Sequence, residues 1–271
     1  KSKTQIELAG LFNADLRLPL TKKTDKYDNS LTPKLSFRFN PSDMKDYSSS
    51  ENKIDTNNIF ALNRLGLSDT LETGRSMTLG LDFKKEKKDD LNEINNYFEV
   101  KLATVLRDKE EKFIPNKTSM SQKNSNLFGS ITNRFSDILD LGYKFSIDND
   151  YNTFKYNDLN ATISVNNFVT TFNFIKESGE TGATNIISNS IAYNLDDKNF
   201  FKYETRRNRR LNLTEYYDLV YEYKNDCLIA GIKYNKSYYE DGDLKPTENL
   251  LFTITLVPLT TYEYSADETL K

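Results

Sequence analysis

The residues from Asp218 to Leu256 read DLVYEYKNDCLIAGIKYNKSYYEDGDLKPTENLLFTITL. Apolar and polar side chains alternate along two runs that meet at a short polar turn, and a third run follows a second turn. This period of two is typical of a β-strand, because successive side chains leave an extended backbone on opposite faces. The run from Leu228 to Tyr238 spans ~33 Å at ~3.3 Å per residue. Tilted by ~45°, such a strand covers roughly the height of the apolar band of a bilayer.

Alternation of the same kind recurs along the chain, and the breaks between runs are rich in Asn, Asp and Ser. These residue types favour turns. No helical period of comparable length competes with the strand period, so the sequence predicts an all-β fold. We expect about thirteen strands, at residues 4–20, 31–40, 74–85, 97–107, 125–135, 139–148, 153–165, 168–176, 185–195, 199–206, 212–224, 227–238 and 247–257.

The lengths of the predicted connections favour one all-β architecture. If the last predicted strand ends on the periplasmic side, the long connections 41–73, 108–124 and 239–246 all fall on the outer side, and tight turns such as 225–226 fall on the inner side. This asymmetry is characteristic of outer-membrane barrels. We therefore predict an antiparallel up-and-down transmembrane β-barrel. Because bacterial single-chain barrels have even strand counts, the odd count predicts that residues 1–271 are a fragment of a larger barrel.

The composition argues against several function classes. The net charge is -3 and the pI is near 5.4, so there is no bulk electrostatic case for nucleic-acid binding. Hydrophobic residues make up 37% and the mean hydropathy is -0.68, and no stretch approaches the length of an apolar transmembrane helix. Histidine is absent, which removes His-based catalytic triads and HExxH zinc sites. We expect no enzyme activity, no cofactor and no metal site, and we expect any signal peptide to lie outside this chain.

The segment Asp148–Asn152 begins like a calcium-binding loop, with oxygen-bearing side chains at its first, third and fifth positions. An EF-hand loop needs Gly at the sixth position and Glu at the twelfth. Thr153 and Leu159 stand there in this chain. We therefore expect a hairpin turn stabilised by Asp and Asn side chains.

A resemblance to a known family is carried by four stretches, which are Asp218–Leu256, Asn58–Arg64, Thr73–Arg75 and Leu79–Leu81. Together they resemble LptD, the lipopolysaccharide-assembly barrel of Gram-negative outer membranes, also called the organic solvent tolerance protein. The resemblance implies that the chain is the C-terminal part of the barrel domain, with an N-terminal periplasmic domain outside it. It also implies that lipopolysaccharide arrives over a periplasmic LptA-like bridge, that an LptE-like lipoprotein plugs the lumen, and that the barrel inserts lipopolysaccharide into the outer leaflet.

The densest basic cluster spans Arg206 to Arg210. It could be a solvated turn or a nucleic-acid patch, but the rest of the chain offers no basic surface that would extend such a patch. The predicted topology places the cluster on the outer side, where lipopolysaccharide phosphates lie. Arginine binds phosphate through two parallel hydrogen bonds. The phosphate-contact hypothesis, with a solvated turn as its alternative, concerns Arg206, Arg207, Arg209 and Arg210.

Cys227 is the single cysteine, so a disulfide within this chain is impossible. The default interpretation is a small buried hydrophobic residue. The resemblance implies another role, because a cysteine at the matching place in the LptD family joins the barrel to the N-terminal periplasmic domain. Leu228 follows it here, so at most one such disulfide is expected, with a partner upstream of this chain in an oxidising periplasm.

The resemblance also implies an exit seam for lipopolysaccharide between the first and last barrel strands. The last predicted strand, 247–257, is ended by Pro258, which cannot donate a hydrogen bond to a neighbouring strand. We predict that this strand forms one side of the lateral gate. The residues concerned are Thr247, Leu250, Phe252, Ile254, Leu256 and Pro258.

Two other functions remain open. A passive porin or autotransporter barrel would have a complete, shorter barrel with a constricting loop folded into its lumen. A secreted all-β adhesin would never enter a membrane, so both faces of its strands would be buried or solvated in water without detergent.

Overall fold

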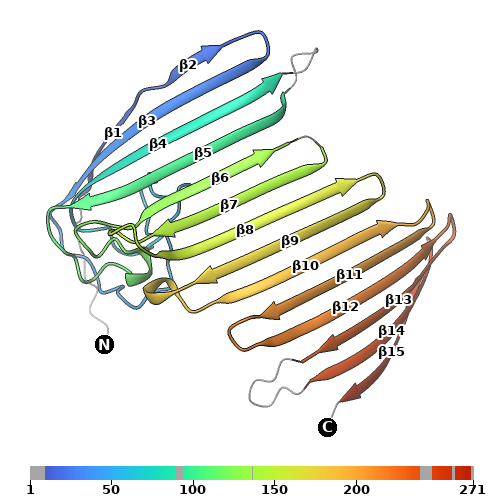
Figure 1. Ribbon diagram of the computed structural model, residues 1–271. Coiled ribbons are helices and arrows are strands. Elements are labelled where there is room, and N and C mark those ends of the chain that lie inside the picture. Colours follow the sequence, from blue (N-terminus) through green and yellow to red (C-terminus); the bar gives the residue numbers. More distant parts are fainter. Residues whose placement is uncertain (1–9, 89–93, 136, 239–245, 258–259, 270–271) are drawn as a thin grey trace. The chain divides into compact units, whose positions relative to one another are not determined.

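The computed structural model describes residues 10–88, 94–135, 137–238, 246–257 and 260–269 (Figure 1). These residues form fifteen strands and two short 3₁₀ helices, so the predicted all-β class is confirmed. No helix in this part of the chain is long and apolar enough to cross a membrane. The strands are β1 (Phe12–Arg17), β2 (Leu20–Lys23), β3 (Tyr27–Asn40), β4 (Gly74–Lys88), β5 (Ile94–Arg107), β6 (Leu127–Arg134), β7 (Leu139–Ile147), β8 (Phe154–Val165), β9 (Phe168–Glu177), β10 (Asn185–Asn194), β11 (Asn199–Asn208), β12 (Leu213–Lys224), β13 (Leu228–Ser237), β14 (Thr247–Leu256) and β15 (Thr260–Thr269), and the 3₁₀ helices are η1 (Asn116–Thr118) and η2 (Gly179–Thr181).

The sheet has an antiparallel up-and-down topology, as predicted. Its strand order is β1-β3-β4 and then every following strand in sequence to β15, with β2 paired to β3 beside β1. β1 and β2 are therefore two parts of one strand that is interrupted at Leu18 and Pro19, where proline has no N–H to donate. Because the topology is up-and-down, alternate connections lie at the same end of the strands.

Each of the thirteen predicted strands overlaps a strand of the structure. The first, 4–20, overlaps β1 and only the first residue of β2, and its residues 4–9 lie outside the described residues. The prediction that 247–257 is the last strand is wrong, because β15 pairs with β14 along its whole length, from Thr247↔Thr269 to Leu256↔Thr260. β15 reads TTYEYSADET, in which the tyrosines are the only large side chains with apolar character. An alternation this polar gives too weak a period-two signal to be recognised from the sequence.

The chain divides into two compact units. The first comprises residues 1–134, 142–158 and 177–183, and the second comprises residues 135–141, 159–176 and 184–271.

In the first unit, strands β3 to β5 have one apolar and one polar face. The strand register aligns Phe37 with Met77 and Leu35 with Leu79 on the apolar face. The exposed side chains of this face include Phe37, Met77, Leu79 and Leu81. The register places the opposite set on the polar face, and its buried members include Ser36, Arg38, Asn40, Ser76, Thr78 and Arg107.

Strands β11 to β14 of the second unit show the same division. The register aligns Tyr221 with Ile232 and Ile232 with Phe252, and all three side chains are exposed. The other face is polar, with ion pairs such as Lys233–Asp218 at 3.6 Å. A barrel wall that faces lipid presents an exposed apolar side opposite a polar one, whereas the inner faces of a soluble sandwich pack on each other. The pattern therefore argues against a secreted adhesin.

One charged pair lies on the apolar face of the second unit, near the end of β13. Lys236 Nζ lies 3.0 Å from Glu248 Oε2, and the hydroxyl of Tyr234 donates to Glu248 Oε1 at 2.8 Å. The ammonium also lies 5.5 Å from the ring centroid of Tyr238. Tyrosines and a lysine that is paired with a carboxylate suit the boundary between lipid and water when they lie at a strand end.

Candidate functional site

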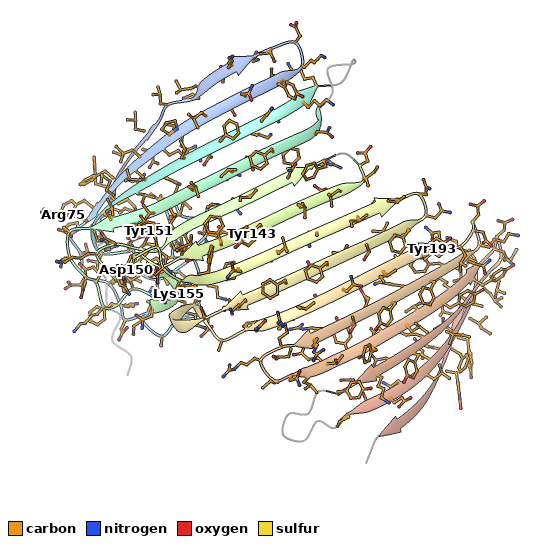
Figure 2. All side chains as sticks on the ribbon, viewed as in Figure 1. Arg75, Tyr143, Asp150, Tyr151, Lys155 and Tyr193 are labelled. Atoms are coloured by element: carbon orange, nitrogen blue, oxygen red, sulfur yellow. The ribbon has the colours of Figure 1, made fainter. Side chains whose placement is uncertain are left out.

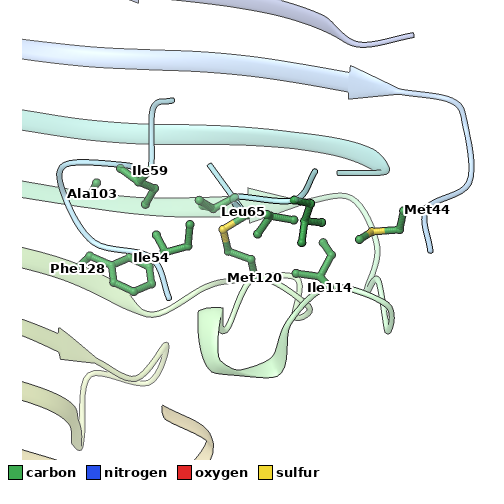
Figure 3. Packing of buried hydrophobic residues seen from close by; sticks show 10 residues of the cluster. Met44, Ile54, Ile59, Leu65, Ala103, Ile114, Met120 and Phe128 are labelled. Atoms are coloured by element: carbon green, nitrogen blue, oxygen red, sulfur yellow. The ribbon is translucent and has the colours of Figure 1, made fainter. Parts of the chain in front are cut away.

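The two longest described connections of the first unit fold onto the polar face of its strands. They are residues 41–73, between β3 and β4, and residues 108–126, between β5 and β6, and together they are named the loop cap. Figure 3 shows the apolar side chains that the loop cap buries between itself and the strands. This core consists of Met44, Ile54, Ile59, Leu65, Leu67, Ile114 and Met120 from the loop cap and Ala103, Val105 and Phe128 from β5 and β6.

Backbone hydrogen bonds join the two connections to each other. The amide of Tyr47 donates to the carbonyl of Phe113 at 3.0 Å, and the amide of Asn116 donates to the carbonyl of Ser48 at 3.1 Å. Buried backbone groups need such partners when the chain forms neither helix nor strand. The loop cap is thus an ordered part of the first unit, although it contains no regular secondary structure except η1.

A buried carboxylate fixes the loop cap to the strands. Arg64 donates to both oxygens of Glu72, from Nε at 2.7 Å and from Nη2 at 2.6 Å. Arg107 of β5 donates to the same carboxylate. The guanidinium of Arg64 also donates to Thr78 at 2.7 Å and to Ser76 at 2.9 Å on β4. Bidentate arginine–carboxylate pairs have a strict geometry, so this network sets the position of the loop cap on the polar face.

The network holds more positive than negative charge. Burial alone would raise the pKa of Glu72, but the charges of Arg64 and Arg107 and the hydrogen bonds from Arg64 outweigh it and lower the pKa to about 2. Arg38 of β3 is also buried, and it donates to the carbonyls of Ala61 at 2.8 Å and Leu62 in the loop cap. The Glu72 carboxylate therefore compensates buried arginines from both the loop cap and the strands.

A glycine on β4 lets the loop cap approach the strand closely. A Cβ atom at Gly80 would lie 2.5 Å from the ring of Phe60 in the loop cap. The ring also lies under Lys34 of β3, whose Nζ is 5.4 Å from the ring centroid. Glycine is the residue that permits such an approach, because any side chain would collide with the ring.

An apolar cavity of about 150 Å³ lies under the loop cap, and its apolar lining includes Ile54, Phe128 and Phe145. Three lysines also line it, and each has an acidic partner. The pairs are Lys53–Glu177, Lys117–Glu51 and, at 3.3 Å, Lys144–Asp55. These lysines tie parts of the first unit together and do not present unpaired charge to the cavity.

The structure separates the four arginines that the sequence grouped together. Arg206 and Arg207 are neighbours on β11, so their side chains leave opposite faces. A β-bulge opposite them lets Glu215 reach Arg206, with 2.7 Å between Oε2 and Nε. Arg209 and Arg210 lie in the turn between β11 and β12. Arg206 is thus paired with Glu215 on the polar face, Arg207 leaves the opposite face, and Arg209 and Arg210 belong to the turn.

Cys227 lies in the turn between β12 and β13, and its side chain is exposed. The default expectation that it is a small buried hydrophobic residue is therefore wrong. Its amide donates to Asn225 Oδ1 at 3.0 Å, which fixes the turn. An exposed thiol is accessible to a partner, and the disulfide to an upstream domain stays a prediction.

The residues predicted to form a lateral gate lie on β14, except Pro258, which is outside the described residues. They are Thr247, Leu250, Phe252, Ile254 and Leu256. β14 has a hydrogen-bonded neighbour on each side, β13 and β15, so it is not the last strand of the described order. The gate assignment stays a prediction, and the strand at this end of the order is β15.

Asp148 forms the expected hairpin turn. Its Oδ1 accepts hydrogen bonds from the amides of Asn152 at 2.8 Å and Thr153 at 3.3 Å. These amide hydrogen bonds lower the pKa of the Asp148 carboxyl. In the part of the chain that the structure describes, no group of three His, Cys, Asp or Glu residues could hold a metal ion.

Sequence reasoning missed the loop cap. A signal was present, because Ile54, Ile59, Leu65 and Leu67 interrupt an otherwise polar connection and Arg64 is the only basic residue between Ile54 and Leu67. Apolar side chains in a long connection indicate that it packs on something, and a charged residue between them needs a buried partner. The identity of that partner could not be read from local spacing.

A family model described as "LptD: LPS transport system D" matches residues 1–199. The matched region includes Asn58–Arg64 but not Asp218–Leu256, so the family assignment rests on the first part of the chain. No curated protein matches. Two solved structures, one titled "Asymmetric conductivity of engineered proteins" and the other a double mutant of the Rh. blastica porin, are each 9% identical and cover 97% of this chain and 95% of theirs at a TM-score of 0.35.

Proposed function

This chain belongs to the LptD family, and from that membership we propose that it transports lipopolysaccharide as part of a β-barrel in the outer membrane. The observation that supports the proposal is the division of the strands into an exposed apolar face and a polar face. Lipid covers the apolar face, and the polar face borders the route of the sugar portion. Such transport requires no covalent chemistry, so no enzyme activity is expected.

The proposal includes the partners that accompany the family function. An LptE-like lipoprotein binds on the polar side, and an LptA-like bridge delivers lipopolysaccharide through a periplasmic domain outside this chain. The exposed thiol of Cys227, in the short turn between β12 and β13, supports a disulfide to that domain.

Depletion of the full-length parent protein tests the transport function. Newly made lipopolysaccharide is expected to accumulate in the inner membrane and to fall several-fold in the outer membrane, because insertion into the outer leaflet is blocked. Pulse labelling followed by separation of the two membranes measures the distribution. Normal delivery of labelled lipopolysaccharide after depletion would contradict the proposal.

A passive porin is a second candidate, because the loop cap lies on the polar face, where a constricting loop would lie. A porin would conduct small ions in a planar bilayer, and its depletion would slow solute uptake without changing lipopolysaccharide delivery. The depletion experiment therefore separates the two functions.

The arginines at the β11–β12 turn belong to the same proposal as contacts for lipopolysaccharide phosphates. Replacing Arg206, Arg207, Arg209 and Arg210 with Gln is expected to raise outer-membrane permeability to large apolar antibiotics several-fold, because neighbouring lipopolysaccharide molecules lose an anchor. Most of the effect should remain when Arg206 is left intact, because that residue is paired with Glu215. Antibiotic susceptibility measures the effect, and heat-modifiable gel migration checks the fold.

A matched control removes four positive charges from a strand of the first unit. It replaces Lys84, Lys85, Lys87 and Lys88 of β4 with Gln. Equal permeability in the arginine variant and the unmodified protein, or an equal rise in the lysine control, would contradict phosphate binding at the turn.

A further inference from the structure

A second cavity, of about 260 Å³, lies at the loop-cap end of the first unit and is lined by polar residues and one glycine. Three connecting segments line it, together with Lys155 of β8. The three segments are the β5–β6 connection of the loop cap, the β7–β8 turn and η2. Its volume lies just below the ~300–1,000 Å³ of typical small-molecule sites, so it suits one small ring and its substituents.

The lining consists of side-chain amides, hydroxyls and carboxylates, with one ammonium group. The residues that present them include Asn116, Ser119, Gln122, Asn126, Asn149 and Asp150. An amide offers donors and acceptors together, and a hydroxyl does the same on one oxygen. A sugar ring needs this mixture, because each of its hydroxyls both donates and accepts.

The charges of the lining disfavour a phosphate. Asp148 and Asp150 contribute two carboxylates, and the one cation of the lining, Lys155, has its Nζ 3.9 Å from Asp148 Oδ2. A bare metal ion is also disfavoured, because Asp148 Oδ1 already accepts two backbone amides. The cavity therefore favours a neutral, hydroxyl-rich ligand.

The walls of the cavity are held in place from several sides. The hydroxyl of Thr181 donates to the carbonyl of Lys155 at 2.7 Å, which ties η2 to β8. The side-chain amide nitrogen of Asn149, Nδ2, donates to Gln122 Oε1 at 3.4 Å, which joins the β7–β8 turn to the loop cap. A site whose polar groups are already positioned loses less entropy when it binds a ligand.

An exposed aromatic ring stands next to this cavity. Tyr151 follows Asp150 in the β7–β8 turn, is 66% exposed and has a φ of +60°. Figure 2 labels Tyr151 and Asp150, which are adjacent in this turn. A bulky residue with positive φ is uncommon, and such conformations cluster at binding sites. Tyr151 adds an exposed aromatic side chain to the turn whose residues Asp148, Asn149 and Asp150 line the cavity, and a sugar presents both apolar and polar surface.

We propose that this cavity is a saccharide subsite that binds one neutral, hydroxyl-rich sugar ring of the lipopolysaccharide oligosaccharide. The identification of the sugar as part of lipopolysaccharide rests on the proposed function. Sugar binding itself rests on the lining of the cavity and on Tyr151.

Calorimetric titration of the detergent-solubilised full-length protein tests the subsite. The probes are lipid-free core oligosaccharide, maltoheptaose and inorganic phosphate. Saturable binding of the core oligosaccharide is expected, and phosphate should give none. Replacing Gln122 and Asn149 together with Ala should weaken binding at least tenfold, and Tyr151→Ala should weaken it several-fold.

A matched control removes another exposed amide from the loop cap. Asn57→Ala lies away from the cavity and should bind the oligosaccharide as the unmodified protein does. Hydrogen exchange of the loop cap, unchanged in all variants, shows that lost binding is not lost folding. No saturable sugar binding, phosphate binding in its place, or equal losses in the Asn57 variant would each overturn the subsite.

The depletion experiment distinguishes a failure of the saccharide subsite from a failure of the transport function. Sugar binding with normal lipopolysaccharide delivery after depletion would support the subsite and contradict the transport function. Blocked delivery after depletion without sugar binding would support transport and overturn the subsite.

Discussion

Replacing Glu72 with Gln is expected to release the loop cap from the strands. The carboxylate is buried between Arg64 and Arg107, and glutamine leaves both guanidinium groups without a negative charge. Breaking a buried ion pair by removing one partner costs roughly 3–5 kcal/mol, because the remaining charge is buried and uncompensated. Amide protection in residues 41–73 and 108–126 should fall by about two to three orders of magnitude. Hydrogen exchange read by mass spectrometry measures this, with protease sensitivity of the same residues as a second observable.

A matched control is Glu51→Gln in the same loop cap. Glu51 pairs with Lys117, but its side chain is 78% exposed. Exposed ion pairs are worth about 0–1 kcal/mol, so this variant should keep nearly all of its protection. Wild-type protection in the Glu72 variant, or equal losses in both variants, would show that the buried network does not hold the loop cap.

In the unmodified protein, lowering the pH should release the loop cap from the strands, as the Glu72 substitution does. The folded pKa of Glu72 is about 2, below its ordinary value of 4.5. Because folding lowers the pKa of Glu72, its carboxylate stabilises the folded state at pH values above 4.5. This stabilisation is lost as the pH falls from 4.5 towards 2. The contribution at neutral pH is about 3 kcal/mol. The Glu72→Gln variant should lack this acid-dependent loss of protection, and this comparison separates Glu72 from other carboxylates.

The strands could be predicted from the sequence because their signal is local. Leu141, Tyr143 and Phe145 alternate with polar or small neighbours, and that period specifies both the strand and its two faces without knowledge of any partner. β15 was not predicted because its side chains are too polar to show the apolar–polar alternation of a strand. The interruption at Pro19 has a local cause as well, since proline lacks the N–H that a continuous strand would use.

The loop cap could not be predicted in the same way because its contacts join distant parts of the chain. Glu72 meets Arg107 of β5, 35 residues along the chain, only after the connection 41–73 has folded back onto the polar face. No periodic pattern in the sequence predicts this contact. The arginine cluster shows the same limit, because a β-bulge brings Glu215 to Arg206 and divides residues that look equivalent in the sequence.

Replacing Ile59 with Ala is expected to destabilise the docked loop cap by roughly 2–5 kcal/mol. Ile59 is fully buried in the core that the loop cap forms with β5 and β6. The smaller side chain leaves a cavity, because the strands beneath are held by their hydrogen bonds and cannot move to fill it. The expected loss of amide protection in the loop cap is about two orders of magnitude, measured by hydrogen exchange at neutral pH, where Glu72 is ionised.

Leu62→Ala is the control, because Leu62 lies in the same turn of the loop cap but its side chain is 63% exposed. It should change protection by less than about threefold, since surface substitutions stay within about 0.5 kcal/mol. Together with the Glu72 variant, this pair separates two contributions to docking. A loss at Ile59 that persists at about pH 2 would identify apolar burial as the independent contribution, because acid protonates carboxylates and leaves the apolar contacts unchanged. Equal effects at Ile59 and Leu62 would mean that the apolar core does not hold the loop cap, and that the polar face is open in solution.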